Sequence, residues 1–252
     1  MRVLSAGLTD VGRKRTHNED SFLIDDAMQV YVVADGMGGH AGGGTASKIA
    51  VETIDKELRA IREAPDNPFT RHRPLQESQV PEAVRTAVER ACAAIFHAAR
   101  GDPELSGMGT TVISLVIADD AAFFAHVGDS RAYLVRGDLI QQISEDHSLV
   151  NEQIKAGMLT PEEAKHSRYK NIITRSVGFE EEVQVDVMGL LAEPGDTFVL
   201  CSDGLANMIE DGELLDIVQK HTLSEIPKKL VELANNRGGD DNITVIVVQT
   251  RV

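Results

Sequence analysis

The sequence predicts an α+β domain in which helices cover the faces of antiparallel β-sheets. Three observations support this class: short apolar runs of β type at both ends of the chain, hairpins in the middle, and two blocks with helical periodicity. With 252 residues, 42% of them hydrophobic, the chain is long enough for one large core. We therefore predict a single domain over residues 1–252.

The N-terminal third combines strands with two helices. Strands are expected at residues 3–8, 22–24 and 30–34. Apolar residues then recur every three or four positions from Ala46 to Ile61, which predicts an amphipathic helix. A second helix is expected after Pro81, with Val84, Val88 and Ala91 on its apolar face. The proline-rich residues 63–79 between the helices predict a loop.

The middle of the chain predicts two hairpins. Residues 111–118 and 121–127 are joined by Asp119-Asp120, and residues 132–135 and 139–143 by Arg136-Gly137-Asp138. Connections of two or three such residues are typical of antiparallel pairs. Residues 148–170 are polar, and the capping box Thr160-Pro161-Glu162-Glu163 predicts a short helix there.

The C-terminal third returns to strands around a helical block. Strands are expected at residues 183–191 and Thr197–Cys201, helical patterns fill residues 213–237, and residues 243–248 predict a buried final strand.

The charge balance narrows the set of partners. Lysine plus arginine number 25 and aspartate plus glutamate 40, so the net charge is −15. Nucleic acids and anionic membrane surfaces require positive potential, and we therefore expect neither as a partner. No apolar run spans a bilayer, no signal peptide is recognisable, and the two cysteines form no framework. A cytoplasmic location is the expectation.

Acidic residues stand where apolar strands end. Asp35-Gly36, Asp129 and Asp203-Gly204 each follow such a run, whereas Glu19-Asp20 and Asp241-Asn242 precede one. A single Asp-Gly pair is typical of a turn, but this repeated placement suggests convergence. Ionised carboxylates that converge need a counter-charge. Oxygen ligands without Cys or His at ligand spacing favour Mg²⁺ or Mn²⁺ over zinc.

A set of motifs, in order along almost the whole chain, resembles the metal-dependent protein phosphatases of type 2C (the PPM family) in their bacterial single-domain form. The motifs are Arg15-Thr-His-Asn-Glu-Asp20, Val33-Ala-Asp-Gly-Met-Gly-Gly-His40, Gly109-Thr-Thr111, Val127-Gly-Asp-Ser-Arg131, Asp146-His-Ser148, Thr174-Arg-Ser-Val-Gly178, Ser202-Asp-Gly-Leu205 and Asp241-Asn-Ile-Thr244. The resemblance implies two stacked antiparallel sheets flanked by helix pairs.

The resemblance also implies a two-metal site. Asp35 would bridge two Mn²⁺ or Mg²⁺ ions and the Gly36 carbonyl would ligate one of them. Asp203 and Asp241 would hold the first ion. Of the neighbouring pair Asp240-Asp241, the family pattern selects Asp241, which precedes the asparagine.

Further residues complete the implied site. Glu19 and Asp20 would act at the second ion, mostly through water, and Asp129 with Asp203 would hold a weaker third ion. Arg15 would grip the substrate phosphate with its fork of donors. The polar residues 148–170 would correspond to the flap beside the site.

The proton donor is left open. Met37 stands where animal members often carry a histidine proposed as general acid. His40 is a candidate for the catalytic role, and the alternative is that it only caps or orients the following helix. His126 and His147 are expected to be structural.

The implied activity is hydrolysis of phosphoserine and phosphothreonine in proteins by a metal-activated water, without a covalent intermediate. Such a protein-serine/threonine phosphatase acts on phosphorylated proteins and opposes a Ser/Thr kinase in signalling. The absence of DxDxT, Cys-x5-Arg and Gly-x-Ser-x-Gly is consistent with this mechanism.

Two alternatives compete with the phosphatase. Residues 36–41 fit the GxGxxA pattern of dinucleotide-binding enzymes, although Asp35 would repel a pyrophosphate and the later strands predict no βαβ unit. A catalytically inactive regulatory member would only bind phosphoproteins. The presence of Asp35, Asp203 and Asp241 gives no reason to expect inactivity.

One basic stretch has two interpretations. Lys165, His166, Arg168 and Lys170 could attract a phosphorylated segment, or they could belong to a solvated surface loop.

Overall fold

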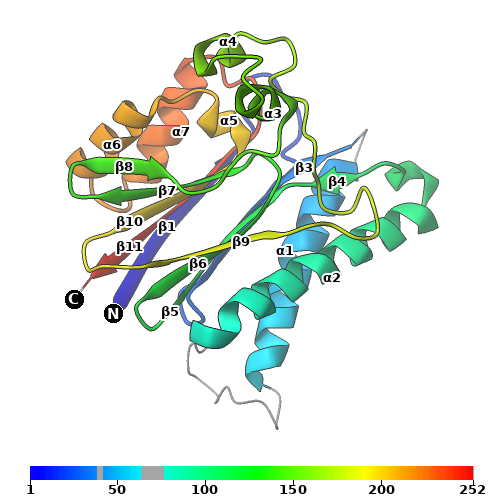
Figure 1. The fold of residues 1–252 in the computed structure, drawn as a ribbon, viewed down its shortest axis with the longest axis horizontal. Coiled ribbons are helices and arrows are strands. Elements are labelled where there is room, and N and C mark those ends of the chain that lie inside the picture. Colours follow the sequence, from blue (N-terminus) through cyan, green and yellow to red (C-terminus); the bar gives the residue numbers. More distant parts are fainter. Residues whose placement is uncertain (39–41, 64–76, 252) are drawn as a thin grey trace.

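The computed structural model describes residues 1–38, 42–63 and 77–251 and arranges them in four layers (Figure 1). Helices α1 (Gly42–Glu63) and α2 (Val80–Gly101) cover the outer face of a six-stranded sheet, and α5 (Asp203–Ala206), α6 (Asp211–Lys220) and α7 (Ile226–Asn236) cover that of a five-stranded sheet. The two sheets face each other, and a third hydrophobic core fills the space between them. The helix–sheet–sheet–helix architecture expected from the resemblance is therefore present.

Every strand pairing in the two sheets is antiparallel. The six-stranded sheet has the order β2-β3-β5-β6-β9, with β4 added beside β3, and the five-stranded sheet has the order β1-β11-β10-β7-β8. The first sheet contains β2 (Asp20–Asp25), β3 (Val30–Met37), β4 (Gly109–Thr110), β5 (Val112–Ala118), β6 (Ala121–Val127) and β9 (Asp186–Leu191). The second contains β1 (Arg2–Asp10), β7 (Arg131–Arg136), β8 (Leu139–Gln142), β10 (Thr197–Cys201) and β11 (Ile243–Arg251).

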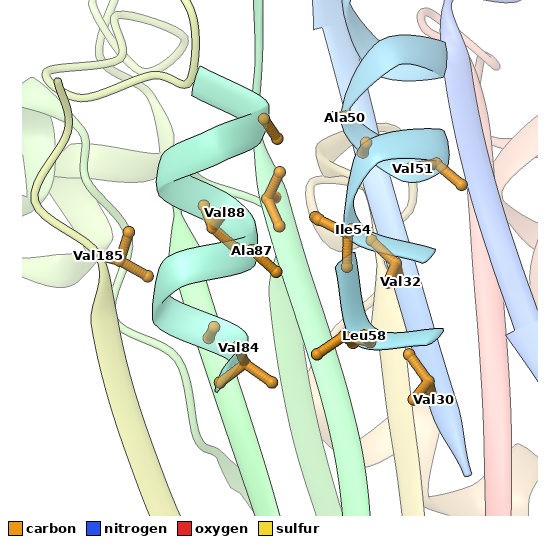
Figure 2. Close-up of a cluster of buried hydrophobic side chains, with 14 of the residues drawn as sticks. Val30, Val32, Ala50, Val51, Ile54, Leu58, Val84, Ala87, Val88 and Val185 are labelled. Carbon is orange, nitrogen blue, oxygen red and sulfur yellow. The ribbon is translucent and has the colours of Figure 1, made fainter. Parts of the chain in front are cut away.

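The two-residue period of the strands explains why each sheet can bury both faces. Along β3, Val30, Val32 and Ala34 join the core under α1 and α2, whereas Tyr31 and Val33 point between the sheets. Figure 2 shows Val30 and Val32 packed against Ile54 and Leu58 of α1. Strands buried on both faces are continuously apolar rather than alternating, as β5 and β6 are.

The inter-sheet core is closed by aromatic contact. The rings of Phe124 on β6 and Phe198 on β10 meet edge to face, with centroids 5.8 Å apart, and both side chains are fully buried. On β11, Ile246 and Val248 face the same core, while Val245 and Val247 turn to the layer of α5–α7.

Most predicted elements are confirmed, including both hairpins and the capping box of α4 (Pro161–Lys165). In the first hairpin Asp119 adopts a positive φ of 53°, which is the backbone that a tight antiparallel turn needs. Three short elements were not expected: β4, α3 (Leu149–Lys155) and α5. The helical block at 213–237 divides into α6 and α7, because the backbone is extended at His221. Residues 64–76 of the predicted loop lie outside the described residues.

The antiparallel topology brings the acid-bearing strand ends to one edge of the sandwich. Asp20 opens β2 directly opposite Asp35 near the end of β3. Cys201, which ends β10, pairs with Val245 near the start of β11. Helices α3 and α4 lie at this same end, beside α5 (Figure 1). Among the described helices, none combines the length and apolar character needed to cross a membrane.

Replacing Phe198 by alanine should lower the free energy of unfolding by about 3–5 kcal/mol, because the inter-sheet core cannot close around the lost ring. Leu139→Ala is the control, since this side chain at the hairpin tip is 75% exposed and its truncation should cost less than about 0.5 kcal/mol. Urea unfolding of both variants measures the difference. Equal destabilisation would contradict the placement of the inter-sheet core.

Candidate metal centre

The structure brings the predicted acidic residues to the same end of the sandwich from five separate parts of the chain. Asp35 lies near the end of β3, Asp203 begins α5 directly after β10, and Asp241 precedes β11. Asp20 opens β2, and Asp129 follows β6. The carboxylates of Asp20, Asp129, Asp203 and Asp241 all act electrostatically on that of Asp35.

The backbone of Asp35 is held by the neighbouring Thr-Thr pair. Its carbonyl accepts hydrogen bonds from the Thr111 N–H and the Thr110 hydroxyl, each at 2.8 Å, and its N–H donates to Thr111 Oγ1 at 3.0 Å. Thr111 Oγ1 in turn lies 2.7 Å from Ser130 Oγ. The Gly109-Thr-Thr111 motif therefore fixes the direction in which the Asp35 side chain leaves the strand.

Gly36 is required by a close approach of two backbones. A Cβ atom at this position would lie 2.0 Å from the Gly43 carbonyl oxygen and 2.6 Å from the Glu19 carbonyl oxygen. The Gly36 N–H also donates to the Glu19 carbonyl at 3.2 Å. Any larger residue would push the start of α1 and the Glu19-Asp20 segment away from Asp35.

Asn242 ties the N-terminal acidic segment to the C-terminal one. Its Oδ1 accepts from the Glu19 N–H at 2.8 Å, and its Nδ2 donates to the carbonyls of Val11 and His17, each at 2.9 Å. Its own N–H donates to Asp241 Oδ1 at 2.9 Å. The side chain and the backbone N–H of this one residue thus hold Glu19 and the Asp241 carboxylate near each other.

Asp20 is buried, and only one of its two carboxylate oxygens accepts hydrogen bonds. Oδ2 accepts hydrogen bonds from Ser202 Oγ at 2.9 Å and Thr244 Oγ1 at 2.6 Å, whereas Oδ1 is buried without a partner. Glu19 Oε1 is likewise buried and unpartnered. A buried carboxylate oxygen without a donor is costly, and a cation relieves that cost.

Burial and mutual repulsion disfavour the ionised forms of these acids. Burial, with a smaller contribution from Asp203, raises the pKa values of Asp20 and Asp129 to about 7. The pKa of Asp35 is raised well above its usual range by burial and then by Asp20. The pKa of Asp203 is raised by burial and then by Asp241. Such a cluster requires positive charge to be ionised at neutral pH.

Arg15 supplies part of that charge to Asp241. Its Nη2 donates to Asp241 Oδ2 at 2.7 Å, and its side chain remains 49% exposed. The guanidinium therefore lies at the mouth of the site, where one face contacts the carboxylate cluster and the other meets solvent.

The donor set fits hard divalent cations. It consists of carboxylate and carbonyl oxygens, including two buried oxygens without partners. Within residues 1–38, 42–63 and 77–251, no group of three or more His, Cys, Asp or Glu side chains is by itself arranged to hold an ion. Backbone carbonyls, water and small side-chain rotations would thus have to complete any coordination shell.

The loop that carries Asp129 is anchored from the base of the flap segment (residues 148–170). Arg131 donates to both carboxylate oxygens of Asp146, and the Gly128 N–H donates to His147 Nδ1 at 3.0 Å. His147 Nε2 faces Asp186 Oδ2 at 3.0 Å, and the ring stacks on His126 with centroids 4.7 Å apart. Both histidines thus occupy structural positions. His40 lies outside the described residues.

Comparison with known proteins identifies the family. A profile described as "Protein phosphatase 2C" matches residues 11–240. Protein phosphatase PhpP of Streptococcus pneumoniae is 40% identical over 250 residues, which cover 96% of this chain and 95% of that protein. The chain belongs to the protein phosphatase 2C family.

Solved structures agree with this assignment. The serine/threonine phosphatase PstP of Mycobacterium tuberculosis is 32% identical and superimposes with a TM-score of 0.88, with 99% of each chain covered. A catalytic domain of PstP described in complex with two manganese ions gives a TM-score of 0.85 at 32% identity, again covering 99% of each chain. The dinucleotide-binding alternative is wrong, because the described strands form no βαβ unit around the glycine-rich segment.

Several residues that position the acids of this phosphatase received no individual role from the sequence. They are Thr110, Thr111, Ser202, Asn242 and Thr244, all of which belong to the recognised motifs. Their common feature is a small polar side chain buried beside an apolar strand. That feature signals a structural hydrogen bond, but only the fold shows which acid each one holds.

Asp20→Asn should stabilise the metal-free protein at pH 7.5, because it removes a buried charge while keeping an oxygen for Ser202 and Thr244. The folded-state pKa of Asp20 lies above its unfolded value of 3.8, so wild type gains stability as pH falls through about 7. The difference in the free energy of unfolding between the variant and wild type should therefore shrink by on the order of 2 kcal/mol between pH 7.5 and 5.5. Urea unfolding in the presence of a chelator measures it.

The comparison with Asp20→Asn is needed because His126 and His147 have lowered pKa values and act in the opposite direction over this range. Both proteins carry these histidines, so their effect cancels in the difference. A stability difference between the two proteins that does not change with pH would contradict the raised pKa of the buried Asp20.

Proposed function

We propose that the chain hydrolyses phosphoserine and phosphothreonine in proteins in a reaction that depends on Mn²⁺ or Mg²⁺. The observation that carries this proposal is the cluster of buried carboxylates with unpartnered oxygens at the end of the sandwich. The likeness to a PstP domain described with two manganese ions supports it.

The family resemblance and the arrangement of the acids support the following set of ligands. Asp35 would bridge two ions, the Gly36 carbonyl would bind one of them, and Asp203 with Asp241 would complete the first ion's protein ligands. Glu19 and Asp20 would act at the second ion, mostly through water, and Asp129 would serve a weaker third ion with Asp203. Bound ions of this kind lower the pKa of water and stabilise negative charge on phosphoryl oxygens.

The chain's own residues prepare the site for that chemistry. Thr111 holds the backbone of Asp35 and the Asn242 N–H binds the carboxylate of Asp241, so both carboxylates are in place before substrate arrives. Arg15 presents a half-exposed guanidinium whose planar fork matches two phosphoryl oxygens. Protonation of the leaving serine or threonine oxygen needs a donor, and His40 stays a prediction for that role.

The proposed biological setting is a single catalytic domain that carries the flap segment and acts on phosphoproteins in the bacterial cytoplasm. There it would oppose a Ser/Thr kinase in signalling. Both cysteines, Cys92 and Cys201, are buried free thiols, which is in keeping with a reducing compartment.

Asp241→Asn should lower kcat/KM for a phosphothreonine peptide by at least about 100-fold, because it removes a charged ligand from the site. Asp240→Asn is the matched control. Asp240 is the exposed neighbour of Asp241 and lies outside the proposed ligand set, so this variant should retain wild-type activity. Phosphate release is measured with Mn²⁺ and again with a chelator. Activity that survives chelation, or equal loss in both variants, would refute the two-metal proposal.

Arg15→Ala should raise KM for the same peptide by roughly 10- to 100-fold, the range expected from losing a charge-assisted hydrogen-bond pair to phosphate. Inhibition by inorganic phosphate should weaken in parallel, because phosphate uses the same fork. Arg13→Ala, at a nearby exposed position, serves as the control. An unchanged KM with a lower kcat would mean that Arg15 only positions Asp241 and does not bind the substrate phosphate.

A further inference from the structure

A groove runs from the acidic cluster along the underside of the flap segment. Its volume is about 1020 Å³, and Asp129 and Asp203 line its inner end. This volume lies at the upper end of the range of ligand sites in proteins. The groove is therefore continuous with the proposed metal centre and large enough for more than a phosphorylated side chain.

The two walls of the groove come from different segments of the chain. One wall is the segment from α5 to α6, where Arg237 donates to the Met208 carbonyl and pairs with Glu213. The other wall is formed by α3 and α4, which pack on each other and are attached at their base by the bridge between Ser148 and Ile173. The flap wall is thus a small unit of two helices, and it lies opposite the α5–α6 segment that Arg237 contacts.

An exposed ion pair joins the two walls of the groove. Lys165 on α4 donates to Glu210 Oε1 and Oε2 at 3.2 and 3.3 Å, and the two side chains are 51% and 70% exposed. Glu210 is the N-cap residue of α6, and its backbone N–H donates to Glu213 Oε2 at 3.1 Å, so the backbone that carries this carboxylate has a fixed place. The ammonium group of Lys165 marks a position that a lysine or arginine from outside could take.

Two other charged side chains of the groove already have partners. Arg131 and Arg237, which also line the groove, are held by Asp146 and Glu213. Between the charged ends, the walls carry apolar side chains from both sides, including Val150, Ile154 and Ile209. Such a lining suits an extended polypeptide with a basic residue near the rim.

We propose that the substrate polypeptide beside the phosphorylated residue lies in this groove, and that a lysine or arginine of the substrate replaces Lys165 on Glu210. The inference rests on the proposed phosphatase function and adds a substrate preference to it. Glu210 makes the enzyme favour phosphosites with basic neighbours over neutral ones, and Lys165, as an internal competitor for Glu210, weakens that preference. This assigns Glu210 as a specificity determinant away from the reacting atoms.

The test compares phosphothreonine peptides that differ only in arginine or glutamine at positions on either side of the phosphothreonine. For wild type, kcat/KM should be higher for at least one arginine peptide. Glu210→Gln should lower the arginine-to-glutamine ratio roughly two- to five-fold, the range for one exposed ion pair, while the bond from its backbone N–H to Glu213 is retained. Lys165→Gln should raise the same ratio, because it frees Glu210.

The control is Glu232→Gln, which breaks a comparable exposed pair with Lys229 on α7 and should leave the ratio at its wild-type value. Circular dichroism melting checks that all variants are folded. Ratios that stay the same in both groove variants, or fall in both, would overturn the proposal. Hydrolysis of p-nitrophenyl phosphate by the wild type with Mn²⁺ is a separate readout, and its absence would instead refute the proposed function.

Discussion

The structure depends on gathering several carboxylates at one end of a sandwich where they repel one another. Asp20, Asp35 and Asp203 come from different strands or strand ends, and burial raises the pKa of each. A fold would ordinarily avoid this arrangement, since uncompensated buried charge opposes folding. The sheets tolerate it because their hydrophobic layers provide the stability and because cations can enter from the open edge.

The architecture makes that gathering geometrically simple. Antiparallel strands place the end of one beside the start of the next, so Asp35 faces Asp20 within one sheet. The second sheet stacks over the first through Phe124 and Phe198, which brings Asp203 and Asp241 to the same edge. Rigid strands and hydroxyl or amide hydrogen bonds then fix the carboxylates, which is the preorganisation that electrostatic catalysis requires.

The side of the site that faces substrate is built differently from its base. The acids rest on strands buried on both faces, whereas the groove is bounded by the two short helices of the flap segment and by an ion pair exposed to water. Exposed ion pairs contribute little to stability, so exchange of one partner costs little. In our proposal, chemistry and substrate choice thus belong to different parts of the fold.

The sequence by itself determined the strands, the long helices, the antiparallel class and the acids of the site. These rest on local rules: apolar period, turn composition and the placement of Asp next to Gly or Asn. These rules did not predict the short elements β4, α3 and α5, because a segment of two to seven residues carries too little periodicity.

Only the tertiary structure decided which side chain holds which acid. Arg15 and Asp241 are 226 residues apart in the chain, and Glu210 lies 45 residues from Lys165. No local pattern encodes contacts between segments so distant, since they exist only after the two sheets have stacked and the helices have packed on them.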